Sequence, residues 1–289
     1  MAAGRAGDGI GEPAWACWVL VFAALAVIGV MLVMPLIVIF AGALAQGWNV
    51  AAAALADPDA QSAIRLTLLV AAIVVPLNTV FGLAAAWCLV HFRFPGRALL
   101  VTLIELPFAV SPVVAGLLYV LLFGLQGWFG PFLRDHGVPV IFALPGIVIA
   151  TIFVTLPLVA RQVMPLMQAQ GIAEEEAALT LGANGWQIFR LVTLPKIRWA
   201  LLTGMLLCNA RAMGEFGAVS VVSGRITGAT MTMPLQIENL YNSYSLPAAF
   251  AMASLLSLLA CVTIFLRMAL EWHGERVVAR GARAVSVQR

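Results

Sequence analysis

Two side chains of opposite charge, Arg211 and Glu215, lie four residues apart inside a largely apolar run of this chain. On an α-helix that spacing puts both on one face, where they can pair. A charge in hydrocarbon costs about 3 kcal/mol or more, so such residues usually have a specific role. Two interpretations stay open: a structural ion pair that locks this helix to a neighbour, or an Arg211 that attracts an oxyanion on a transport path. In either case Gly214 and Gly217 would permit close helix approach.

Groups that would support covalent or metal-dependent chemistry are not brought together by the sequence. The three histidines lie far apart without metal-ligand spacing, and the four cysteines lie in apolar runs without a CxxC pattern: His91, His136, His273, Cys17, Cys88, Cys208 and Cys261. We therefore expect no catalytic residue, no metal and no cofactor in this chain. The cysteines are interpreted as small packing residues.

Three consecutive carboxylates, Glu174–Glu176, open a polar stretch with its own pattern. Acids favour the first turn of a helix, and Gly182 is the kind of residue that ends one. Asn184 followed by Gln187 has the pattern of a capping box that begins a second helix, and Pro195 closes the unit. The stretch predicts helix, sharp turn and helix with apolar side chains exposed near the turn. That arrangement suits docking of a partner protein, or a helix that lies flat on lipid.

The elements that carry these residues are long and apolar. The chain has 289 residues, of which 63% are hydrophobic and 10% charged, whereas a soluble domain has about 25% charged residues. About 20 apolar residues cross the hydrocarbon layer as a helix. The sequence therefore predicts an all-α integral membrane protein with six transmembrane helices, within Trp15–Phe40, Ile64–Val90, Ala98–Phe123, Ile141–Met167, Leu201–Val222 and Leu246–Ala269.

The chain is expected to form one membrane domain, residues 15–273, between a loose N-terminal segment, 1–14, and a loose basic tail, 274–289. Basic residues concentrate on one side of the predicted spans: Arg5, Arg93, Arg97, Arg161, Arg190, Lys196, Arg198, Arg267, Arg276, Arg280, Arg283 and Arg289. The other side has Arg65, Arg134 and Arg225. Because positive loops stay inside, both termini and the loop 168–199 should face the cytoplasm. The basic tail is expected to favour anionic lipid, and no nucleic acid is expected as a partner.

The polar stretch resembles the EAA loop of ABC importer permeases, E-A-A, three residues, G, nine residues, I, one residue, L-P. The matching residues are Glu176, Ala177, Ala178, Gly182, Leu194 and Pro195, with Val192 in place of the isoleucine. This resemblance implies the type I importer permease architecture, with its core at about residues 60–270. It also implies that the loop forms a cytoplasmic coupling helix seated in a cleft of an ATP-binding subunit.

The chain has no site of its own for ATP hydrolysis. A P-loop needs the pattern G-x-x-x-x-G-K-[ST], and the only lysine, Lys196, follows Pro195. The chain is therefore expected to be a permease subunit and not an enzyme, with ATP bound by a partner subunit.

Longer segments narrow the resemblance. Residues 106–133, 155–168, 208–224 and 240–260 are similar to W-type sulfate/thiosulfate permeases, which are related to molybdate permeases. The resemblance implies a bacterial inner-membrane importer with a T-type second permease as heterodimer partner, two copies of the ATP-binding subunit and a periplasmic sulfate/thiosulfate-binding protein.

Two alternatives to this function remain. The first is an importer of molybdate or tungstate. The second is a secondary anion transporter driven by an ion gradient, for which Glu105 and Glu215 are the carboxylates within the predicted spans.

Overall fold

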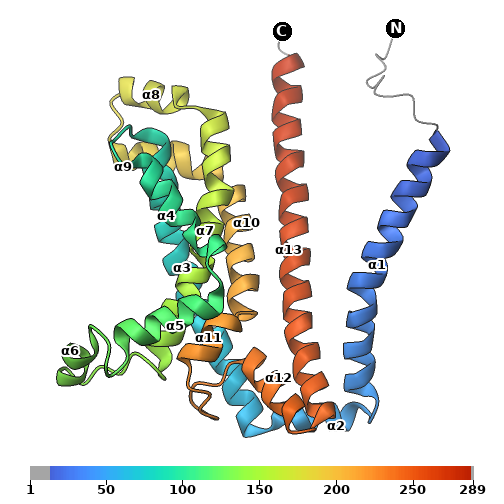
Figure 1. Cartoon of the computed structure of the whole chain (residues 1–289). Helices are drawn as coiled ribbons and strands as arrows, with labels where there is room; N and C mark the ends of the chain where they lie inside the picture. The colour runs from blue at the N-terminus through green and yellow to red at the C-terminus, as the bar shows by residue number, and fades with distance from the viewer. Residues whose placement is uncertain (1–13, 288–289) are drawn as a thin grey trace.

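The computed structural model of the chain describes residues 14–287, and these fold into helices without any strand (Figure 1). The elements in chain order are α1 (Ala14–Leu44), α2 (Trp48–Ala56), α3 (Pro58–His91), α4 (Arg97–Ala109), α5 (Pro112–Phe123), α6 (Gly130–Asp135), α7 (Leu144–Gln170), α8 (Ala173–Thr180), α9 (Gly185–Ile188), the π-helical turn η1 (Phe189–Thr193), α10 (Leu194–Met213), α11 (Gly217–Val222), α12 (Met233–Asn242) and α13 (Leu246–Val287).

Five helices in the described part of the chain are long and apolar enough to cross a membrane, and a sixth crossing requires α4 and α5 to count as one span. The sequence predicted one continuous helix there, but α4 and α5 meet at 109°. Val110 and Ser111 between them have extended backbone, with ψ near 130°. Pro112 explains this, because a proline disfavours helical geometry in the residue before it.

The fifth predicted span also differs from the structure. Helix α10 ends at Met213, and α11 is a separate short helix after Gly214–Phe216. Two glycines within four positions weaken the helix there, since each lowers helix propensity by about 1 kcal/mol. Arg211 and Glu215 therefore flank the end of α10 rather than lying in the middle of a continuous helix.

The core that positions the loop 168–199 consists of α3, α7 and α10, which pack against one another. Fully buried Asn78 on α3 donates through Nδ2 to Thr155 Oγ1, at 2.6 Å, and to the Ile152 carbonyl, at 3.3 Å, both on α7. The Cys208 sulfur on α10 lies 3.7 Å from the same nitrogen. This buried polar contact ties the three helices together in surroundings where an unpaired polar group is unfavourable.

Helices α1 and α13 pack against each other at one side of this core (Figure 1). The sequence predicted a loose tail for 274–289, but α13 continues through Val287. The alanines and arginines of this stretch favour helix. The predicted loose segment 1–14 lies outside the described residues, except that Ala14 begins α1. Helix α8 lies at the same end of the molecule as the start of α1 and the end of α13 (Figure 1).

Close contact between α3 and α7 predicts a strong effect of Gly82→Leu. A Cβ at Gly82 would lie 2.8 Å from Val159 Cβ and 3.0 Å from the Ala160 nitrogen. Overpacking of this kind destabilises by about 1–3 kcal/mol, so the thermal midpoint of the detergent-purified protein should fall. Gly29→Leu on α1 is the matched control, because a Cβ there meets nothing within 4 Å. Equal midpoints for the two variants would contradict the close packing of α3 and α7.

Candidate functional site

The polar stretch folds locally as its sequence predicts. Helix α8 ends at Thr180, and Gly182, just beyond the C-cap residue, has φ +86°. The Gly182 N–H donates to the Leu179 carbonyl at 3.0 Å and the Ala183 N–H to the Ala178 carbonyl at 3.1 Å, the bond pair of a Schellman motif. Asn184 and Gln187 then form both bonds of the predicted capping box. The helix, turn and second helix are thus confirmed.

The second helix does not stop at Pro195. One turn of α9 passes into the π-helical turn η1 and then directly into α10, so the path from Gly185 to Met213 is continuous. Pro195 is the second residue of α10, which directly follows η1, so the continuous helix lacks one backbone N–H donor at this point. The second helix of the loop is therefore one end of a helix long and apolar enough to cross a membrane.

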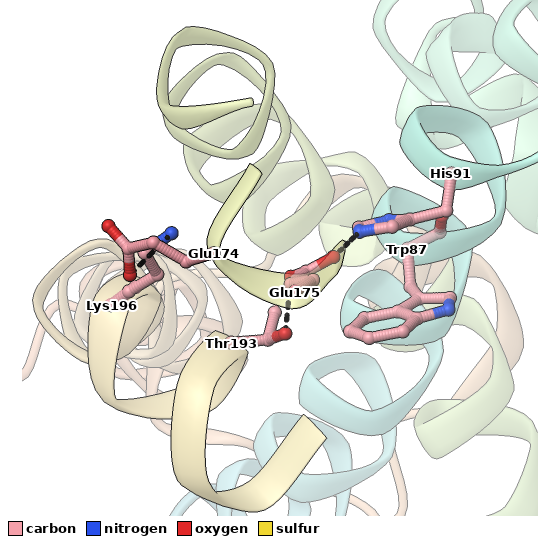
Figure 2. A network of polar contacts seen from close by, with 6 residues as sticks. All are labelled: Trp87, His91, Glu174, Glu175, Thr193 and Lys196. Atoms are coloured by element: carbon pink, nitrogen blue, oxygen red, sulfur yellow. Dashed lines mark hydrogen bonds and ion pairs between the residues drawn. The ribbon is translucent and has the colours of Figure 1, made fainter. Parts of the chain in front are cut away.

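The three acidic residues of α8 have different environments (Figure 2). Glu174 pairs with Lys196 Nζ at 3.0 Å but is itself 69% exposed. Glu175 is 12% exposed; its Oε2 lies 2.5 Å from His91 Nε2, and its Oε1 accepts a hydrogen bond from the Thr193 hydroxyl. Glu176, the acid of the EAA pattern, is exposed. The residue of the EAA pattern is thus exposed, whereas its neighbour Glu175 is largely enclosed and engaged at both oxygens.

Aromatic rings surround the histidine. Trp87 stacks on His91 with 4.2 Å between ring centroids, and Phe189 meets Trp87 edge-on at 5.4 Å. The His91 Nδ1 lies 3.2 Å from the Trp87 carbonyl oxygen. Sequence reasoning treated His91 as an isolated histidine and gave Glu175 and Thr193 no role. No local pattern marks them, because Glu175 lies 84 residues from His91 and 18 residues from Thr193 along the chain.

The outer face of this loop is apolar and unusually exposed. Leu179, Leu181 and Trp186 are 63%, 89% and 68% exposed. Beside them a groove of about 380 Å³ runs between the end of α3 and helices α8 and α9, with Arg93 and Glu176 among its lining residues. Of the remaining residues of the EAA pattern, Ala177 and Pro195 are exposed, and Ala178 and Leu194 are half-buried. An apolar patch bordered by charges is typical of a protein contact.

The Arg211–Glu215 pair forms at the break between α10 and α11. Arg211 Nη1 lies 2.9 Å from Glu215 Oε2, and Glu215 Oε1 accepts the Ala218 N–H at 3.0 Å. The Glu215 side chain is 1% exposed, whereas that of Arg211 is 44% exposed. A Cβ at Gly217 would lie 2.9 Å from Pro112 Cβ, so close approach occurs there. A Cβ at Gly214 would meet no neighbouring helix, so the expectation of close approach at that glycine is wrong.

Residues 78–271 match the family described as binding-protein-dependent transport system inner membrane component. The chain belongs to this family. Helices α3 to α13 carry the match, and they include both the loop and the Arg211–Glu215 pair.

Several relatives resemble the chain over most of its length. It is 51% identical to the "Sulfate transport system permease protein CysW" of Escherichia coli (strain K12), covering 90% of each chain. It is 52% identical to the protein of the same name from Synechocystis sp., over 88% of this chain and 92% of the relative. Identity to the "Sulfate transport system permease protein CysT" of Salmonella typhimurium is 40%, over 81% of this chain and 83% of the relative.

A solved chain of a bacterial alginate ABC transporter, in complex with an alginate pentasaccharide-bound periplasmic protein, has the same fold. The TM-score is 0.72 over 91% of this chain and 95% of the other, at 16% identity. That likeness concerns the fold alone. It establishes the type I importer permease architecture that the EAA resemblance implied.

The ion pair predicts a charge-dependent effect on stability. Arg211→Gln leaves the buried Glu215 carboxylate without its cation, which for a fully buried pair costs about 3–5 kcal/mol. Because Arg211 is nearly half exposed, we expect a smaller loss, measured as a lower thermal midpoint in detergent. Adding Glu215→Gln should restore part of that loss, because the uncompensated charge is gone. A double variant no more stable than Arg211→Gln would show that the charge of Glu215 is not what Arg211 stabilises.

Proposed function

We propose that this chain is the permease subunit of an ATP-driven importer of sulfate in a bacterial inner membrane. The observation that carries the proposal is the exposed apolar tip of the loop, at Leu179, Leu181 and Trp186, on a stretch with the EAA pattern. Family membership and the 51% identity to a sulfate transport permease support the substrate class. Thiosulfate, a tetrahedral oxyanion of similar size, belongs to the same proposal.

The proposed importer has four kinds of component. This chain pairs with a homologous T-type permease, and the 40% identity to a protein of that type supports a heterodimer of related subunits. Two copies of an ATP-binding subunit bind the cytoplasmic face and hold all the ATP. A periplasmic sulfate/thiosulfate-binding protein delivers the anion, and membrane lipid covers the remaining apolar surface. This chain itself holds no cofactor.

In the proposed mechanism α8 is the coupling helix. Closure of the ATP-binding subunits moves α8, and the packed core of α3, α7 and α10 follows, because these helices are tied by buried contacts. A movement of this kind shifts the population between inward-open and outward-open states. The distribution of arginines supports the assignment of the α8 end of the molecule to the cytoplasm. The start of α1 and the end of α13 lie at that same end (Figure 1).

A secondary transporter is less well supported by the geometry. A proton relay needs carboxylates that can gain and lose protons on the path. Glu215 is instead engaged by Arg211 and by the Ala218 N–H. This engagement of Glu215 disfavours a mechanism driven by an ion gradient.

The coupling role predicts that Glu176→Lys and Gly182→Pro each abolish sulfate uptake while the protein stays in the membrane. Lysine reverses the charge of the exposed face of α8, and proline cannot adopt the φ of +86° at Gly182. Uptake of radiolabelled sulfate by whole cells, normalised to membrane-inserted protein, is the measurement. Gly137→Pro is the matched control, since Gly137 has φ +67° in a loop after α6, away from α8. Normal uptake by both loop variants would refute the coupling assignment.

The substrate is tested on the assembled complex. We expect ATP hydrolysis by the complex in proteoliposomes to rise when the binding protein carries sulfate or thiosulfate, and to rise less with molybdate or tungstate. Uptake should cease when ATP is withdrawn while a proton gradient is maintained. Preferential stimulation by molybdate would show that molybdate, and not sulfate, is the substrate. Uptake without ATP would refute the proposed ATP-driven mechanism.

A further inference from the structure

We propose that Glu175 is the positioning residue that joins the coupling helix α8 to two membrane helices at once, through His91 at the end of α3 and through Thr193, the last residue of η1 directly before α10. This inference rests on the proposed function and deepens it. It states how displacement of α8 reaches the membrane core, and it separates the residue that holds the loop, Glu175, from the exposed face that meets the ATP-binding subunit.

The backbone on both sides of α8 contains a glycine and is therefore conformationally permissive. Gly171 precedes it with φ +65°, and Gly182 follows it with φ +86°; a Cβ at either position would meet nothing within 4 Å. No residue of α8 is fully buried. A helix linked by glycines and lacking a buried face must be held by other contacts if it is to transmit a displacement instead of pivoting.

Glu175 provides the most enclosed of those contacts. One carboxylate oxygen is engaged by His91 and the other by the Thr193 hydroxyl (Figure 2). Glu175 and His91 are 12% and 15% exposed, and Thr193 is buried. Partial exclusion of water strengthens such charge-assisted bonds relative to pairs on the surface.

The partners of Glu175 are themselves fixed. His91 stacks on Trp87, and its second ring nitrogen faces the Trp87 carbonyl at 3.2 Å. Thr193 is the last residue of the π-helical turn η1, an irregularity that in helices often coincides with functional positions. One arm of the contact therefore ends on the last residue of α3, and the other on the last residue before α10.

The neighbouring acid offers an internal comparison. Glu174 also ties α8 to α10, through Lys196 at 3.0 Å, but Glu174 is 69% exposed. Exposed pairs contribute little, about 0–1 kcal/mol. Glu174 and Glu175 thus differ by one position on the same helix, and of the two only Glu175 contacts both α3, through His91, and the turn η1 that leads into α10, through Thr193.

The test measures the amount of sulfate imported per ATP hydrolysed, with the complete complex and its binding protein in proteoliposomes. For Glu175→Ala we expect this ratio to fall by about five-fold or more, the lower range of coupling between sites. The ATP-binding subunit should still co-purify, and basal ATP hydrolysis should persist. Glu174→Ala is the matched control and should leave the ratio within about two-fold of the unmodified protein. The ratio is insensitive to the amount of folded complex, because both quantities scale with it.

Two further variants separate the arms of the contact. His91→Phe keeps the stacking on Trp87 without the contact to Glu175, and Thr193→Val removes only the hydroxyl. Each should lower the ratio less than Glu175→Ala does, and neither should lower it further when combined with Glu175→Ala. Glu175→Gln preserves shape and serves if the alanine variant fails to assemble; it too should lower the ratio.

The inference is overturned if an assembled Glu175 variant keeps the normal ratio, or if its only defect is loss of the ATP-binding subunit. Failure of the proposed function looks different. In that case the unmodified complex would not couple uptake to ATP, or the Leu181→Cys variant would not cross-link to the ATP-binding subunit. Coupled uptake and cross-linking in the unmodified protein, together with an unaffected Glu175→Ala ratio, would remove this inference and leave the proposed function standing.

Discussion

A backbone N–H or C=O without a partner is severely unfavourable in hydrocarbon, and this constraint governs where the helices of this protein can be interrupted. At the break after α10, Glu215 accepts the Ala218 N–H at the start of α11. Nearby, the Phe142 N–H donates to the carbonyl of Val222 at the end of α11. The side chains and segments around a break are therefore part of what permits it.

The two interrupted spans meet each other. Helices α5 and α11 pack together, and Gly116 and Gly217 allow this, since a Cβ at either would come within 3 Å of the other element. The Arg211–Glu215 pair lies at the same place. Because α11 is the next helix after α10 and packs on α5, this meeting point connects α10 with α5. It lies far from the loop that contains α8, as Figure 1 shows.

At the opposite end, the loop combines a rigid inner side and an apolar outer side. Inside, Glu175 contacts His91 and Thr193, and outside Leu181 projects almost fully exposed. A partner that binds the outer side can move the core through this loop only if the contacts of Glu175 with His91 and Thr193 stay intact. The difference in burial between adjacent acids on one short helix is therefore the link between local structure and the proposed transport cycle.

The sequence by itself determined the membrane class, the EAA stretch, the end of α8 just before Gly182 and the capping box at Asn184, because composition and caps act over a few residues. Only the tertiary structure decided that the third and fifth apolar runs are interrupted, since hydropathy does not register where a helix bends. It also decided that Glu175 rather than Glu176 faces His91. Three adjacent glutamates are chemically identical in sequence, and only the contacts made in the folded chain, with Lys196 for Glu174 and with His91 and Thr193 for Glu175, give each a different environment.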